Sequence, residues 1–288
     1  MSDETLQKVL AAAGFGSRRE MERVIEAGEV QVNGKTAHLG ERVSPGDTLQ
    51  WRGKTHEVPK PTRKEIRVII YNKPEGEICS RNDPEGRSTV FDQLPTLKEG
   101  RWVSVGRLDI NTSGLLLFTN DGELANKLMH PSSGVDREYL VRVQGEVGED
   151  VIARLKEGVL LEDGMARFTD IHPGSGSGGS NSWYYCVIME GRNREVRRLW
   201  ESQELRVSRL KRVRYGPIII PPFVKTGQWL DLADQEIAEL CRRADLPKPP
   251  KRRFKPADVE EQKRRVKKMR ASSGRQAKDA RQSRPRKK

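Results

Sequence analysis

The feature that most limits how this chain can fold is the uneven distribution of its charge. Residues 246–288 contain 18 lysines and arginines against four acidic residues, whereas residues 1–245 contain 36 against 37. The net charge of +13 therefore belongs to the C-terminal end. Because this end has few large apolar side chains, it cannot bury enough surface to offset the entropy cost of ordering. We expect a disordered basic tail and a folded part within residues 1–245.

The charge of this tail also indicates the kind of partner that it would attract. A run of lysine and arginine binds phosphate groups by releasing their counterions. Nucleic acid is therefore the expected partner, ahead of acidic membranes or acidic proteins. A tail that only keeps the protein in solution is the alternative.

The composition excludes several classes of protein. No run approaches the roughly 18–20 apolar residues of a membrane span, and the N-terminus, MSDETLQKVL, lacks the apolar core of a signal peptide. The scattered cysteines argue against a disulfide framework and favour the cytoplasm; they are Cys79, Cys186 and Cys241. The histidines show no metal-ligand spacing, so we expect neither a metal nor a cofactor; they are His38, His56, His130 and His172.

Residues 3–58 have the pattern of a small independent module. The stretch SRRE, Ser17 to Glu20, has the spacing of a capping box and predicts a helix that ends at Gly28. A shorter helix over residues 6–13 precedes it. Asn33-Gly34 follows alternating valines and predicts a hairpin. Two helices and a small hairpin sheet make a compact module.

Basic side chains gather in this module, although exposed arginines on a helix are also ordinary solvent-facing residues. They are Arg18, Arg19 and Arg23 on the second helix and Lys35 on the hairpin. The S-R-R-E start and the sequence EAGEVQVNGK, Glu26 to Lys35, resemble the S4-type RNA-binding domain over nearly the whole module. The resemblance implies that the nucleic acid bound by this protein is RNA and that these side chains contact it.

After a polar linker, residues 59–65, a larger domain is expected over residues 66–245. Alternating strands with few helices predict the α+β class, with a mixed or antiparallel sheet. The expected strands are residues 66–71, 102–105, 114–119, 137–143, 183–190 and 207–215. The expected helices are residues 123–129, 149–157, 193–203 and 234–242. The patch HPGSGSGGSNS, residues 172–182, predicts a surface loop.

Asp109 stands in an unusual setting for a lone carboxylate. The stretch VGRLDINTSGLLLFTNDG, Val105 to Gly122, places it before a polar turn and an apolar run. No histidine, cysteine or second acid lies among residues 100–108. An aspartate in such a turn can simply accept hydrogen bonds from nearby backbone amides. A structural role is therefore the alternative to a catalytic one.

Two other segments carry side chains that suit a catalytic carboxylate. EGRNREVRRLW, Glu190 to Trp200, is rich in arginine. A buried arginine such as Arg197 beside Asp109 would keep the carboxylate ionised. REYLVRV, Arg137 to Val143, places Tyr139 on a strand, where its ring can stack on an unpaired base or pack in the core.

The motif G-R-L-D-x-x-T-x-G-L-L, Gly106 to Leu116, resembles the catalytic motif of the RsuA/RluB-type pseudouridine synthases. YNKPEG, Tyr71 to Gly76, resembles the first motif of that family, and Arg137 to Tyr139 resembles the segment with its active-site tyrosine. Glu190 to Leu199 resembles the segment whose arginine pairs with the catalytic aspartate. The resemblance runs from about residue 5 to residue 240.

This resemblance implies that the protein isomerises uridine to pseudouridine in RNA. Asp109 would be the catalytic residue, Arg197 its ion-pair partner and Tyr139 the ring that stacks on the flipped base. The motif positions Lys73 and Pro74 would be structural. Further arginines near these motifs are expected to contact the RNA: Arg107, Arg192 and Arg194. The reaction needs no water, redox change or energy input, so a lone carboxylate can serve it as nucleophile or through a glycal route.

The basic tail and the stretch SRNDPEGRSTVFDQLP, residues 80–95, most resemble the branch of the family that modifies 23S ribosomal RNA near the peptidyl-transferase region. The implied partner is ribosomal RNA or a ribosome-assembly intermediate, bound by a monomer. A sister enzyme that acts on small-subunit RNA and a non-catalytic ribosome-assembly factor stay open as alternatives.

Overall fold

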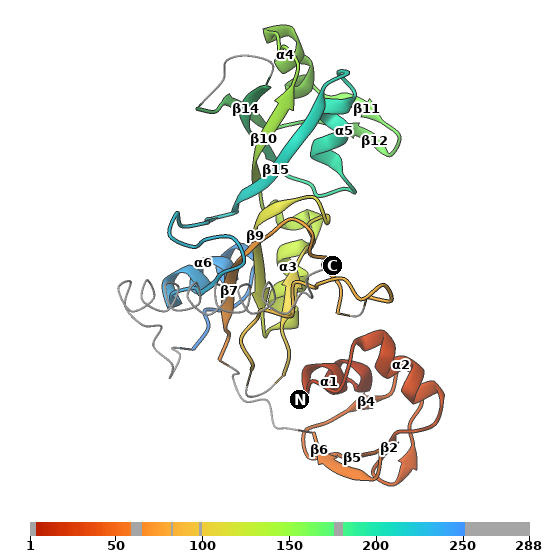
Figure 1. The fold of residues 1–288 in the computed structure, drawn as a ribbon. Helices are drawn as coiled ribbons and strands as arrows, with labels where there is room; N and C mark the ends of the chain where they lie inside the picture. Colours follow the sequence, from red (N-terminus) through yellow and green to blue (C-terminus); the bar gives the residue numbers. More distant parts are fainter. Residues whose placement is uncertain (1–3, 59–64, 82, 98–99, 176–180, 251–288) are drawn as a thin grey trace, which may run out of the picture.

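The computed structural model describes residues 4–58, 65–81, 83–97, 100–175 and 181–250. An N-terminal module, in red and orange, lies beside a larger domain built on one long sheet (Figure 1). The predicted linker (59–65) and basic tail (246–288) lie almost entirely outside the described residues.

The N-terminal module forms as its local sequence predicts. The hydroxyl of Ser17 accepts from the Glu20 N–H at 3.1 Å, and the Glu20 carboxylate accepts from the Ser17 N–H at 3.2 Å, which confirms the capping box. Asn33 and Gly34 have φ of 50° and 80°, as a tight hairpin turn requires. The elements are β1 (Glu4–Thr5), α1 (Leu6–Ala12), α2 (Arg18–Glu26), β2 (Gln31–Val32), β3 (Lys35–Thr36), β4 (Arg42–Val43), β5 (Thr48–Trp51) and β6 (Lys54–Glu57).

The larger domain is built on a mixed sheet, which confirms the α+β class. In the described part of the chain its strands run in the order β13-β14-β10-β15-β9-β7-β17, with β16 beside β15 and β8 beside β9. The strands are β7 (Val68–Lys73), β8 (Val103–Val105), β9 (Ser113–Thr119), β10 (Arg137–Gln144), β13 (Asp170–Pro173), β14 (Asn181–Ile188), β15 (Arg206–Tyr215), β16 (Ile218–Ile219) and β17 (Trp229–Asp231). A separate hairpin pairs β11 (Val159–Leu161) with β12 (Gly164–Ala166).

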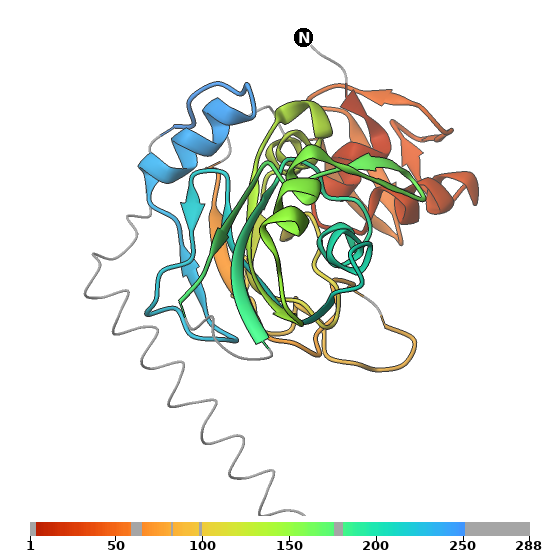
Figure 2. The same ribbon diagram turned by 90° about the horizontal axis from the view of Figure 1, so that it is seen from above.

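The helices of this domain belong to two different hydrophobic cores along the sheet. They are α3 (Gly122–Met129), α4 (Glu149–Glu157), α5 (Glu195–Glu201) and α6 (Asp234–Arg243), with a 3₁₀ turn, η1 (Pro131–Ser133). Along β9, Leu116 and Phe118 enter the core that includes α5, whereas Leu115 and Leu117 enter the core that includes α3 and α6. The view from above shows α6 and the N-terminal module toward opposite sides of this domain (Figure 2).

Several features differ from the sequence-based predictions. The helix expected over residues 193–203 begins only at Glu195, because Arg194 has a left-handed backbone with φ of 49°. The loop expected over residues 172–182 is shorter, since β13 and β14 include its ends. Strands β11, β12, β13, β16 and β17 were not predicted, because each is too short to show a strand pattern. No helix of the described residues is both long enough and apolar enough to span a membrane.

The two halves of the sheet meet at one short parallel contact between β9 and β15. Ser113 pairs with Lys211, and Gly114 pairs with Arg212. Gly114 has φ of +102°, and a Cβ atom at this position would overlap the backbone carbonyl oxygen of Arg212. The Arg212 Nε–H donates to the carbonyl of Leu115 at 2.7 Å and reinforces the contact. Only glycine allows the two strands to approach this closely.

We therefore expect Gly114→Ala to lower the free energy of unfolding by about 3 kcal/mol, because the methyl group adds both backbone strain and overlap. Urea unfolding of the full chain measures this. Gly122→Ala is the matched control: no neighbouring atom lies within 4 Å of its Cβ position, and its stability should change by less than about 0.5 kcal/mol. Equal stability of the two variants would show that the close approach of β9 and β15 is unimportant.

Candidate active site

Asp109 lies in the loop that connects β8 to β9, directly before the β9–β15 contact. Its carbonyl accepts from the Thr112 N–H at 3.0 Å, which closes a turn around Ile110 and Asn111. The residue is partly exposed, whereas Leu108 before it is buried. The aspartate is therefore presented from a loop that is anchored in the core.

A buried lysine forms hydrogen bonds to the backbone of this loop. The side chain of Lys73, at the end of β7, is fully buried. Its Nζ donates to four backbone carbonyls: Pro74 at 2.9 Å, Asp109 at 3.2 Å, Ile110 at 3.4 Å and Thr112 at 2.9 Å. Burial lowers the pKa of Lys73, and the nearby Asp109 carboxylate is among the groups that raise it. The ammonium group thus fixes the loop backbone from Asp109 to Thr112.

We expect Lys73→Met, which keeps the length of the side chain, to lower the free energy of unfolding by about 3 kcal/mol, because the loop carbonyls lose a charged donor. Lys225→Met is the control. Lys225 also donates to a backbone carbonyl, that of Pro222 at 2.8 Å, but it is exposed, so its loss should cost less than about 0.5 kcal/mol. Chemical denaturation that shows equal stability for the two variants would contradict the assignment of Lys73 as the anchor of the loop.

A thiol supports the loop on its other side. The Cys79 Sγ–H donates to the carbonyl of Leu108 at 3.3 Å, and the Leu108 N–H donates to the same sulfur at 3.4 Å. Burial raises the pKa of Cys79, so the side chain stays a neutral thiol. Cys79 therefore helps to hold the backbone of Leu108, the residue before Asp109.

Arg197, on α5, also contacts the loop of Asp109. The side chain is 8% exposed. Its Nη2 donates to the carbonyl of Asn111 at 2.9 Å, and its Nη1 donates to the carbonyl of Val207 at 3.0 Å. Burial lowers the pKa of Arg197, and Arg194 lowers it further, whereas the Asp109 carboxylate raises it. The charge of Asp109 therefore stabilises the buried guanidinium.

The ion pair predicted between Arg197 and Asp109 is not formed in the described part of the chain, where no ion pair within 4.0 Å joins the two side chains. Backbone carbonyls occupy both Nη atoms of Arg197, and its Nε is buried without a partner. Arg197 thus contacts the backbone of the loop, and the predicted direct ion pair with the Asp109 carboxylate is not formed. The catalytic support expected from Arg197 stays a prediction.

Tyr139 lies on β10, between Cys186 of β14 and Arg212 of β15. Its side chain is 7% exposed and belongs to the core that includes α5. This is the packing that the sequence left open as the alternative to base stacking, and stacking on a base stays a prediction.

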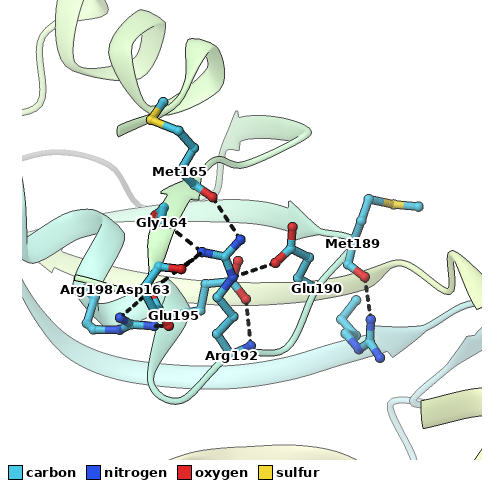
Figure 3. A network of polar contacts seen from close by, with 9 residues as sticks. Asp163, Gly164, Met165, Met189, Glu190, Arg192, Glu195 and Arg198 are labelled. Carbon is cyan, nitrogen blue, oxygen red and sulfur yellow. Dashed lines mark hydrogen bonds and ion pairs between the residues drawn. The ribbon is translucent and has the colours of Figure 1, made fainter. Parts of the chain in front are cut away.

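A polar network fixes the start of α5 and thereby the position of Arg197 (Figure 3). The buried Glu195 carboxylate accepts from the backbone N–H of Arg192 at 3.0 Å. Arg198 makes two contacts of 2.8 Å to the Asp163 carboxylate in the β11–β12 turn. The hairpin and the helix are therefore joined as one unit.

Arg192 was predicted to contact RNA, but its side chain serves this network. The guanidinium donates to the Glu190 carboxylate at 2.6 Å and to the carbonyls of Asp163, Gly164 and Met165 at 3.2, 3.3 and 2.9 Å. These contacts hold the β11–β12 turn. Arg192 therefore has a structural role in this turn, and its RNA contact stays a prediction.

The other basic residues expected to contact RNA are exposed. Arg194 makes one ion pair with Glu201 at 3.6 Å. The rest have no ion pair within 4.0 Å among the described residues: Arg18, Arg19, Arg23, Lys35 and Arg107. Of these, Arg107 lies two residues before Asp109. Their RNA contacts stay predictions.

Sequence reasoning missed two contributors to this site. Cys79 and Arg212 were not singled out, because they act through backbone groups of residues far away in the sequence, and no local pattern marks such contacts. No group of three or more potential metal-binding side chains occurs within the described ranges.

Comparisons with known proteins cover both parts of the chain. A family model described as RNA pseudouridylate synthase matches residues 67–202, and one described as S4 domain matches residues 4–49. The order of the two matches is the order predicted from the sequence. A solved structure titled as the crystal structure of pseudouridylate synthase has a TM-score of 0.57 and 25% identity, over 82% of this chain and 99% of that one.

Two bacterial relatives are closer in sequence. A Pseudomonas aeruginosa protein named ribosomal large subunit pseudouridine synthase B is 57% identical over 243 residues, which are 84% of this chain and 63% of that protein. A Vibrio cholerae protein of the same name is 58% identical over 245 residues, which are 84% of this chain and 76% of that protein. The chain thus spans less than two thirds of the length of the first of these relatives.

Proposed function

The chain belongs to the RNA pseudouridylate synthase family, and we propose that it isomerises one uridine of 23S ribosomal RNA to pseudouridine with Asp109 as the catalytic residue. The observation that carries the proposal is the loop of Asp109, whose backbone is held by the buried cations of Lys73 and Arg197. The names of both relatives support the large ribosomal subunit as the source of the substrate.

The reaction exchanges one bond to the sugar for another. The N1–C1′ glycosidic bond breaks, the base turns while it is retained, and a C5–C1′ bond forms. The proton at C5 leaves and N1 gains a proton, so atoms and electrons balance without water, oxidant or cofactor. One carboxylate suffices, because a second acid of the kind found in glycosidases serves to protonate a leaving group that departs.

Asp109 contributes its negative charge at the sugar. A carboxylate stabilises positive charge that develops at C1′, or it attacks that carbon to form a covalent intermediate. It can also take part in proton removal along a glycal route. Each role requires the carboxylate to keep its place while the base turns, and the hydrogen bonds of Lys73 and Arg197 to the loop backbone provide this preorganisation.

The target base has to leave its stack before Asp109 can reach the sugar. In this proposal Tyr139 stacks on the turned base, and Arg107 and Arg194 contact the flanking phosphates. The N-terminal module, with Arg18, Arg19, Arg23 and Lys35, binds ribosomal RNA or an assembly intermediate. The active unit is a monomer in the cytoplasm.

Tritium release tests the proposal directly, because the hydrogen at C5 is lost to water when the C5–C1′ bond forms. Transcripts of 23S and 16S RNA labelled with [5-³H]uridine are incubated with the full-length protein in the presence of EDTA. We expect release from the 23S transcript alone, to a limit of one tritium per molecule. Release from 16S RNA alone would contradict the proposed substrate, and no release from either RNA would contradict the proposed reaction.

A further inference from the structure

One face of the sheet formed by β10, β14 and β15 is left outside the hydrophobic cores. Side chains alternate between the two faces of each strand. Tyr139, Val141 and Val143 enter the core that includes α5, whereas Leu140 and Arg142 belong to none of the core clusters of the described residues. Strand register places two rows side by side on this second face: Tyr185–Leu140–Lys211 and Trp183–Arg142–Arg209. We call these six residues the outer face.

The outer face carries three basic side chains. Arg142, Arg209 and Lys211 form no ion pair within 4.0 Å in the described part of the chain. The guanidinium carbon of Arg142 lies 6.0 Å from the ring centroid of Trp183. Three cations therefore lie beside one another, and no acidic side chain of the described residues pairs with them.

Two acidic side chains near the outer face are paired with other basic side chains. The Glu138 carboxylate, next along β10, accepts from Arg214 at 2.8 Å. The Asp170 carboxylate, on the edge strand β13, lies 2.6 Å from His172 and 3.4 Å from Lys156. Both carboxylates are already engaged, so the outer face attracts anions.

Two aromatic rings stand next to these cations. Trp183 and Tyr185 are two residues apart on β14, so they share a face at a spacing of about 7 Å. Tyr185 is 36% exposed and Trp183 is half-buried. Exposed aromatic rings beside basic side chains on an open sheet are the arrangement with which several RNA-binding domains stack unpaired bases.

We propose that the outer face binds a single-stranded segment of RNA that flanks the target uridine. Bases stack on Trp183 and Tyr185, while Arg142, Arg209 and Lys211 contact the phosphates. The inference rests on the proposed function, since it takes the partner to be RNA. A duplex would hide the faces of its bases from the two rings, so an unpaired strand fits this surface better. Tyr139 points to the opposite face of β10, and the outer face is therefore a second contact area for the RNA.

Binding of a fluorescein-labelled oligoadenylate of about 12 nucleotides to the full-length protein tests the inference. Fluorescence anisotropy at several salt concentrations gives the affinity and its salt dependence. Trp183→Leu/Tyr185→Leu removes both rings and should weaken binding about tenfold or more. Arg142→Gln/Arg209→Gln should reduce the slope of log K against log salt by about 1.4, because two phosphate contacts are lost.

Two matched variants separate this site from general electrostatics. Arg142→Lys/Arg209→Lys keeps both charges and should retain the wild-type salt slope. Arg242→Gln/Arg243→Gln removes the same charge from α6 and should leave oligonucleotide binding nearly unchanged. Wild-type binding by the ring and charge variants, or an equal loss in the α6 variant, overturns the inference.

Tritium release at saturating ribosomal RNA is measured on the same proteins. Turnover of the α6 variant should stay near the wild-type rate, because Arg242 and Arg243 lie on α6, outside both the outer face and the loop of Asp109. If wild type releases no tritium, the proposed function fails, but the binding comparison still decides whether the outer face is an RNA site.

Discussion

Asp109→Asn is expected to abolish isomerisation while RNA binding stays near the wild-type level. Asparagine has the same shape as aspartate but carries no charge, so it cannot stabilise or trap a cationic sugar. The loop should keep its conformation, because Lys73 and Thr112 contact the backbone carbonyl of residue 109 rather than its side chain. Loss of a group that acts directly on the reacting atoms lowers turnover by about 10⁴-fold or more.

A single-turnover tritium-release assay with enzyme in excess over RNA measures this effect, and a filter-binding assay on the same samples measures affinity. Asp121→Asn makes the same chemical change in the next loop. The Asp121 carboxylate caps α3 through the N–H groups of Glu123 and Leu124, and asparagine is an equally good cap. This control should turn over normally. Activity retained by Asp109→Asn would remove Asp109 from the mechanism.

Arg197→Ala should lower the rate at saturating RNA by roughly 10²–10³-fold, since a preorganised donor at a catalytic loop contributes about this much. The substitution removes the cation that interacts with Asp109 and releases the carbonyls of Asn111 and Val207. The loop then loses its connection to α5, although Lys73 still holds its other side.

Arg197→Lys tells apart the two contributions of Arg197. Lysine restores the charge but cannot contact two separated carbonyls as the guanidinium does, so it should recover only part of the rate. Arg198→Ala is the neighbouring control, because Arg198 contacts Asp163 in the β11–β12 turn instead of the loop. A near-wild-type rate for Arg197→Ala, or an equal loss for Arg198→Ala, would show that the loop does not depend on Arg197.

Elements that form through short-range contacts were predictable from the sequence. The capping box of Ser17 and Glu20 joins partners three residues apart. Helix α4 has the predicted bounds, Glu149–Glu157. The β11–β12 hairpin was not predictable, because its turn is held by Arg198, 35 residues from Asp163, and its strands have only three residues each.

The same distinction applies to the site. The motifs pointed to Asp109, whose catalytic role stays a prediction, and they assigned Lys73 a structural role, with which its buried contacts agree. They did not reveal which atoms Lys73 holds, since the loop carbonyls of Asp109 and Thr112 lie 36 and 39 residues away. Arg197 was expected on the carboxylate of Asp109, but it binds the carbonyl of Asn111. A motif indicates which side chains gather at a site. The backbone groups that these side chains contact can be identified only from the structure.

Pseudouridine mapping on ribosomal RNA tests whether this protein modifies 23S RNA and whether it uses Asp109 to do so. RNA from cells that lack this gene is treated with carbodiimide and read by reverse transcription, with wild type or Asp109→Asn supplied from a plasmid. We expect one 23S site to disappear in these cells and to return only with wild type. If no 23S site disappears, or if Asp109→Asn restores it, the proposed reaction or its catalytic residue is wrong.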